Sequence, residues 1–75
     1  MFTVLRKNFG GRNHDRYFSD WERAKKELLA DVNKTIEGEN CKLISSENNQ
    51  IDYWFFEYRE KCSWSLIECD FEDNL

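Results

Sequence analysis

The sequence predicts an α+β domain in which one helix packs on a mainly antiparallel, four-stranded sheet, with the element order β-α-β-β-β. Three observations predict this fold. One segment repeats its apolar residues at helical spacing, four segments alternate as strands do, and short polar turns separate the last three of these segments. Since strands joined by tight turns form an antiparallel meander, we expect the N-terminal strand to pair with one edge of that meander.

The N-terminal strand is predicted over residues 2–6, where apolar side chains alternate weakly. Gly10 and Gly11 then form a turn, because glycine adopts a positive φ at little cost. The polar residues 12–16 are predicted to be a loop, or the first part of a second short strand that continues into the two aromatic residues that follow. The four-stranded fold leaves this segment out of the sheet.

A helix is predicted over residues 20–37. Ser19 has the side chain of an N-cap, and Glu22 three residues later completes a capping box. Gly38 stands where a C-cap glycine is expected. The apolar stripe that would face the sheet recurs every three or four residues, at Trp21, Ala24, Leu28, Val32 and Ile36.

Three strands are predicted after the helix, over residues 41–46, 51–58 and 62–71. The polar segments 47–50 and 59–61 form the turns between them, and the asparagine pair in the first turn tolerates a left-handed φ. The three strands therefore form the meander.

The composition fits one domain spanning residues 1–75, in which about 72–75 form a flexible acidic tail. The 75 residues include six Phe, three Trp and three Tyr, an aromatic content that argues against disorder. No apolar run approaches the ~18–20 residues that cross a bilayer. The apolar stretch at the N-terminus is too short for a secretory signal, so we expect a cytoplasmic protein.

The three cysteines, Cys41, Cys62 and Cys69, are expected to be reduced thiols, because an odd number does not close a disulfide framework. Neither they nor the one histidine, His14, have the spacing of a zinc site, so we expect no metal and no cofactor. The sequence also contains no phosphate-binding loop and no nucleophile motif. We therefore expect no enzyme and no small-molecule substrate.

The strand predicted over residues 51–58 carries large apolar groups on both of its sides. One helix covers only one side of a sheet, and an exposed apolar patch marks an interface. Three interpretations stay open: the N-terminal segment folds over the second side, a second copy covers it in a homodimer, or another protein binds it. The expected interface anchors are the aromatic residues Tyr53, Trp54, Phe56, Tyr58 and Trp64.

The net charge of −4 is unevenly distributed, with +3 on residues 1–17 and −7 on residues 18–75. The acidic residues near the C-terminus would form a rim that docks on a basic nucleic-acid-binding protein, as a mimic of the phosphate backbone. This acidic rim consists of Glu68, Asp70, Glu72 and Asp73. Ordinary solubilising charge is the alternative interpretation of the same residues.

The basic N-terminal segment suggests a different partner, because basic and aromatic residues together hold single-stranded nucleic acid by phosphate contact and stacking. Its candidate residues are Arg6, Lys7, Arg12 and Arg16. Four charges are few, however, and the acidic remainder of the chain would repel a phosphate backbone. The charge therefore argues against nucleic acid as the main partner.

Residues 17–28, which read YFSDWERAKKEL, and the alternating acids of residues 65–70 resemble a pattern in small phage and bacterial proteins of unknown function. In those proteins a strand ends in an aromatic-Ser pair and a helix follows. The resemblance implies an α+β fold and a mobile-element or accessory role, and it brings no catalytic residues. Together the observations predict a small non-catalytic protein-interaction module.

Overall fold

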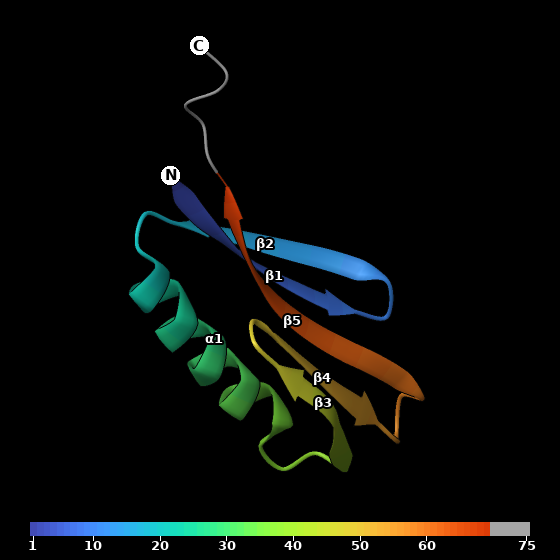
Figure 1. Cartoon of the computed structure of the whole chain (residues 1–75). Coiled ribbons are helices and arrows are strands. Elements are labelled where there is room, and N and C mark those ends of the chain that lie inside the picture. Colours follow the sequence, from blue (N-terminus) through green and yellow to red (C-terminus); the bar gives the residue numbers. More distant parts are fainter. Residues whose placement is uncertain (70–75) are drawn as a thin grey trace.

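Residues 1–69 form one antiparallel sheet of five strands, and a single helix lies along one of its faces (Figure 1). The structure is a computed structural model, and it describes residues 1–69. In the sheet the strands lie in the order β2-β1-β5-β4-β3. The elements are β1 (Phe2–Phe9), β2 (Arg12–Phe18), α1 (Trp21–Ile36), β3 (Cys41–Glu47), β4 (Gln50–Phe55) and β5 (Glu60–Cys69).

The α+β class and the meander are confirmed, and β1 pairs with the edge of the meander through β5, as expected. The four-stranded sheet and the order β-α-β-β-β are wrong, because residues 12–18 form a fifth strand. Gly10 and Gly11 both have a positive φ, 62° and 85°, which suits a two-residue hairpin turn between β1 and β2. The backbone pairing of that hairpin makes β2 a strand although its side chains are mostly polar.

The bounds of the later elements also differ from the prediction. The N-cap of α1 is Asp20, whose carboxylate accepts a hydrogen bond from the Glu22 backbone N–H at 3.1 Å, and Ser19 lies one residue before it. Strand β4 ends at Phe55 instead of continuing to Tyr58. The left-handed φ expected in the first turn is confirmed at Asn48, where it is 44°.

The hydrophobic core lies between α1 and the sheet. The helix makes its main contacts with β1, β5 and β2, so it lies nearer to the β2 edge of the sheet than to the β3 edge. Among residues 1–69, no helix is long and apolar enough to cross a membrane. The buried residues of the core are Leu5, Ala24, Leu28, Val32, Phe55, Cys62, Trp64 and Leu66.

Candidate interaction surface

The sheet has a helix side, which faces α1, and an open side, which faces away from it. Alternate residues of a strand point to opposite sides, so the registers assign each residue to a side once one is known. Leu5 and Trp64 belong to the core under α1, and Ile51 lies opposite Trp64. Tyr53 therefore lies on the helix side and Trp54 on the open side.

Trp64 is fully buried in the core, which corrects the prediction that it anchors a partner. Its indole Nε1–H donates a hydrogen bond to Asp31 in α1 at 2.8 Å, and Tyr53 packs against it edge-on at 6.2 Å between ring centroids. The Lys7 ammonium lies over the Trp64 ring, with Nζ 5.7 Å from the ring centroid. Trp64 is thus the central side chain of the core and is closed to a second protein.

The remaining aromatic anchors do not share one face. Trp54 is half-buried on the open side, between Lys42 on β3 and Lys61 on β5. Phe56 and Tyr58 lie in the turn after β4, where strand alternation no longer applies, and both are exposed. Tyr58 packs edge-on against Phe9 at 5.8 Å. The predicted aromatic sheet face is therefore wrong as a single surface.

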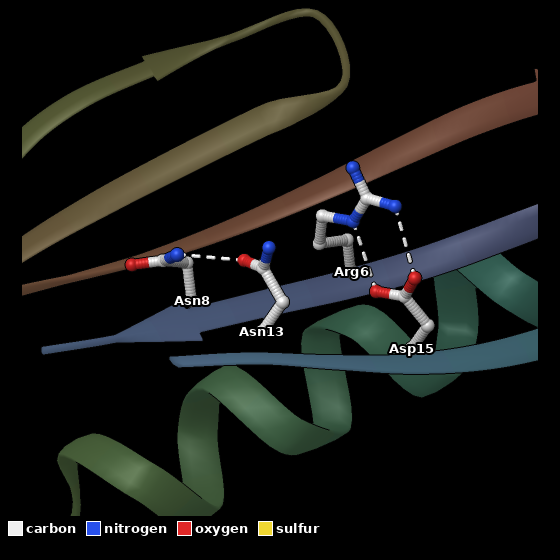
Figure 2. A network of polar contacts seen from close by, with 4 residues as sticks. All are labelled: Arg6, Asn8, Asn13 and Asp15. Atoms are coloured by element: carbon white, nitrogen blue, oxygen red, sulfur yellow. Dashed lines mark hydrogen bonds and ion pairs between the residues drawn. The ribbon is translucent and has the colours of Figure 1, made fainter. Parts of the chain in front are cut away.

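The open side of the sheet is polar in its middle. Figure 2 shows two neighbouring cross-strand pairs of the β1–β2 hairpin on the side away from α1. Both Arg6 to Asp15 contacts measure 2.9 Å, and Asn8 donates to Asn13 at 2.6 Å. The hypothesis that the N-terminal segment folds over a second aromatic face is also wrong, because that segment extends the sheet as β1 and β2.

A row of polar residues crosses the whole open side of the sheet. It begins with the Asn8–Asn13 pair and continues on the neighbouring strands through Ser63, Asp52 and Ser45. Asp52 is buried and accepts a hydrogen bond from Ser45 at 3.0 Å. Burial raises the pKa of Asp52, but hydrogen bonds from Ser63 and its other neighbours outweigh this, and its pKa lies below the ordinary value. The polar groups of this row are thus satisfied within the sheet, which leaves little for a partner to bind.

Exposed and half-buried apolar side chains lie on the helix side of β3 and β4 and on the flank of α1 that faces these strands. The two flanks of α1 differ, because Glu27 and Asp31 on one flank face Arg16 and Lys7 of the β1–β2 hairpin at 3.5 and 3.3 Å. Helical geometry places Leu29 on the opposite flank, toward β4 and β3.

Leu43 of β3 lies opposite Tyr53 of β4, on the helix side. Leu29 is 46% exposed and Leu43 50% exposed, whereas Ile51 and Tyr53 are half-buried. We call this apolar surface the shelf, and it consists of Leu29, Leu43, Ile51 and Tyr53. Among these four residues only Tyr53 is predicted from the sequence as an interface anchor, although Leu43 and the adjacent Ile44 form a visible apolar pair in a short strand.

The four predicted nucleic-acid residues do not gather on one surface. The register places Lys7, Arg12 and Arg16 on the helix side and Arg6 on the open side, where Asp15 pairs with it. Lys7 also donates to the Thr35 hydroxyl at 3.1 Å. Of the four, Lys7 and Arg16 border a cavity of about 380 Å³, which is lined by Leu5, Lys7, Phe9, His14, Arg16 and Asp31.

Of the predicted acidic rim, only Glu68 lies within the described residues. It is exposed on β5, opposite Thr3 of β1. Asp70, Glu72 and Asp73 lie outside the described residues, as does the predicted acidic tail. The rim therefore stays a prediction.

The three cysteines are free thiols, and only Cys62 is buried. Burial, opposed by the charge of Lys7, raises the pKa of Cys62 to about 11, which makes it a poor nucleophile. His14 on β2 and Cys41 on β3 lie on opposite edge strands of the sheet. Within residues 1–69, no group of three or more His, Cys, Asp or Glu side chains is arranged to hold a metal ion.

Comparison of the chain with protein-family models, with curated proteins and with solved structures found no match.

Proposed function

We propose that this chain is a small non-catalytic protein-interaction module that binds a protein partner through the shelf. The observation that supports the proposal is the exposure of Leu29 and Leu43 beside half-buried Ile51 and Tyr53. Burying exposed apolar area is the main driving force of association. Contiguous apolar patches on a small protein typically serve as interaction sites.

The position of the shelf supports the same function. It lies between a helix flank and two strands, so its side chains are held by regular elements and need little ordering on binding. Tyr53 adds an aromatic ring, the kind of residue that is enriched at the centres of interfaces. A partner that presents apolar side chains would complete the cover that α1 provides only over the other half of the sheet.

A docking rim at Glu68, Asp70, Glu72 and Asp73 would add electrostatic steering toward a basic partner. A mobile-element or accessory role and a cytoplasmic location are compatible with such a module.

Single-stranded nucleic acid is the weaker alternative. Lys7 and Arg16 have carboxylate neighbours, Asp31 and Glu27, and these would have to be displaced or desolvated by a phosphate. The remaining charge of the chain is acidic, so counterion release would contribute little to affinity. The shelf needs no such exchange of partners.

Photocrosslinking tests the proposal. A photoreactive phenylalanine analogue at the position of Leu43 is expected to form a defined adduct with a protein chain in the native host. The same analogue at the position of Tyr17, which is 66% exposed on the open side, serves as the control and is expected to form none. Introducing Leu29→Lys should abolish the adduct at position 43, because a charge in the shelf disfavours apolar contact.

Ala30→Lys is the matched control for that change, since Ala30 is exposed on the same helix but lies away from the shelf. It should leave the adduct intact. Equal labelling from positions 43 and 17, or an adduct that Leu29→Lys does not reduce, would overturn the proposal.

A further inference from the structure

Strand β3 is an edge of the sheet, and half of its backbone groups face outward. In an antiparallel pair, residues alternate between those whose N–H and C=O bond the neighbouring strand and those whose groups point away from it. The Asn40 carbonyl accepts a hydrogen bond from the Phe56 N–H at 3.1 Å, so the groups of Asn40 and Lys42 face β4. The backbone groups of Cys41 and Leu43 therefore point outward.

A β-bulge changes this alternation in the middle of β3. The register shifts between Leu43 and Ser45, after which Ser46 lies opposite Ile51 and Glu47 opposite Gln50. Glu47 and Gln50 close a two-residue hairpin turn and bond each other, so the groups of Ser46 point outward. Without the bulge, Leu43 and Ser46 would lie on opposite sides of the sheet, but with it both lie on the helix side.

We propose that β3 pairs with β3 of a second copy of this chain, antiparallel about a two-fold axis perpendicular to the sheet. In this register Leu43 lies opposite Ser46 of the second copy, and Lys42 lies opposite Glu47 of the second copy. This proposal rests on the proposed function, and it names a second copy of the chain as the partner that lies beside Leu43 of the shelf. It produces one continuous sheet of ten strands, with a helix of each copy on the same side.

The register satisfies the backbone and both sides of the sheet together. Leu43 and Ser46 both have outward backbone groups and both lie on the helix side, so they form a bonded pair across the axis. Lys42 and Glu47 both lie on the open side, since they pair with Trp54 and Gln50. Shifting the strands by one residue would place helix-side residues opposite open-side residues, so the alternation of sides excludes that shift.

Charge complementarity supports a second copy as the occupant. Lys42 and Glu47 have no ion-pair partner among residues 1–69. The two-fold axis places Lys42 of each copy opposite Glu47 of the other copy. This gives two opposite-charge cross-strand pairs per dimer.

The other edge of the sheet lacks this complementarity. The antiparallel self-pairings that join most of β2 and keep its sides aligned place Arg12 opposite Arg16, or place Asp15 or Arg16 opposite its own copy. Like charges directly opposite one another destabilise such a pair. The charges of β2 therefore disfavour self-pairing of that edge, whereas the charges of β3 favour self-pairing.

Charge reversal tests the pairing by sedimentation equilibrium over a range of protein concentration. Lys42→Glu is expected to weaken the dimer by about tenfold or more, because it turns two attractive pairs into repulsive ones. Glu47→Lys should weaken it similarly. The double variant Lys42→Glu with Glu47→Lys should restore the wild-type dissociation constant to within about threefold.

Arg23→Glu is the matched control, since it makes the same change in net charge on the exposed surface of α1. It should leave the dissociation constant unchanged. Far-UV circular dichroism of each variant establishes that the sheet is intact. Amide exchange gives an independent readout: the N–H groups of Leu43 and Ser46 should exchange more slowly as concentration rises, and those of Asn13 and Asp15 on β2 should not.

A wild-type protein that stays monomeric at about 1 mM would overturn the proposal, since that concentration populates even weak dimers. A dimer that is insensitive to Lys42→Glu, or a double variant that stays as weak as the single ones, would overturn it too. The proposed function fails separately, when photocrosslinking from position 43 yields no adduct with any chain. If position 43 forms an adduct with a different protein and the chain itself is monomeric, only the proposed β3 pairing is overturned.

Discussion

Trp64 in β5 donates its indole N–H to the carboxylate of Asp31 in α1 at 2.8 Å, and this hydrogen bond joins the helix to the central strand of the sheet. The Lys7 ammonium lies 3.3 Å from the same carboxylate oxygen. One carboxylate at the border of the core thus holds a strand, a helix and a second strand together.

Trp64→Phe is expected to lower the free energy of unfolding by about 2–3 kcal/mol, because it opens space in the core and removes the donor to Asp31. Trp54→Phe is the matched control, since Trp54 is half-buried on the open side, and it should cost less than about 1 kcal/mol. Urea unfolding followed by circular dichroism measures both. Equal losses would show that Trp64 has no special place in the core.

The same contact makes stability depend on acidic pH. Burial raises the pKa of Asp31, but the Trp64 hydrogen bond and the Lys7 charge outweigh it, and the pKa lies below the ordinary value of 3.8. Because the pKa of Asp31 is lower in the folded state than in the unfolded state, its ionised carboxylate stabilises the fold above about pH 4. This stabilisation is lost as the pH falls through the folded-state pKa. The stabilisation by Asp31 should therefore be complete at neutral pH.

Asp31→Asn removes this contribution without changing the size of the side chain. The difference in unfolding free energy between wild type and Asp31→Asn should be largest at neutral pH and should shrink below about pH 4. Urea unfolding at a series of pH values measures it. A difference that stays constant down to about pH 2.5 would contradict the assigned role of the carboxylate.

The cysteines should differ in reactivity. Cys62 is fully buried, and burial raises its pKa to about 11, so about one thiol in a thousand is ionised at pH 8. Cys41 and Cys69 are half-buried. The folded protein is expected to react with an aromatic disulfide reagent at Cys41 and Cys69 and to release the third equivalent only after unfolding.

The variants Cys41→Ser and Cys69→Ser assign these reactions, since each should remove one equivalent from the fast phase and leave the slow one unchanged. A fast phase that loses nothing in either variant would mean that Cys62 is the accessible thiol, and the assigned core would then be wrong.

The parts of the fold with strong local patterns could be predicted from the sequence. The helical stripe from Trp21 to Ile36 and the meander carry their periodicity within short segments, and both are confirmed. Strand β2 lacks such a pattern, because it lies at an edge and most of its side chains face solvent. It becomes a strand through backbone pairing with β1, and this depends on the Gly10–Gly11 turn more than on its own residues.

The candidate site depended on information that no short segment contains. Alternation correctly separates Tyr53 from Trp54, but which of them faces α1 is decided by where the helix lies on the sheet. The bulge after Leu43 and the end of β4 at Phe55 are likewise set by pairing between strands. The shelf and the edge of β3 therefore emerge only from the assembled sheet, although Leu43 and Lys42 are plain in the sequence.

The N-terminus of α1 is the place where a local pattern pointed to the wrong one of two adjacent residues. Asp20 accepts the Glu22 N–H at 3.1 Å and has extended backbone angles, and its carboxylate also interacts favourably with the helix dipole. Asp20→Ala should therefore lower the free energy of unfolding by about 1 kcal/mol, and Ser19→Ala by less than about 0.3 kcal/mol. Urea unfolding of the two variants at neutral pH decides between the caps, and a larger loss for Ser19→Ala would reinstate the capping box that begins at Ser19.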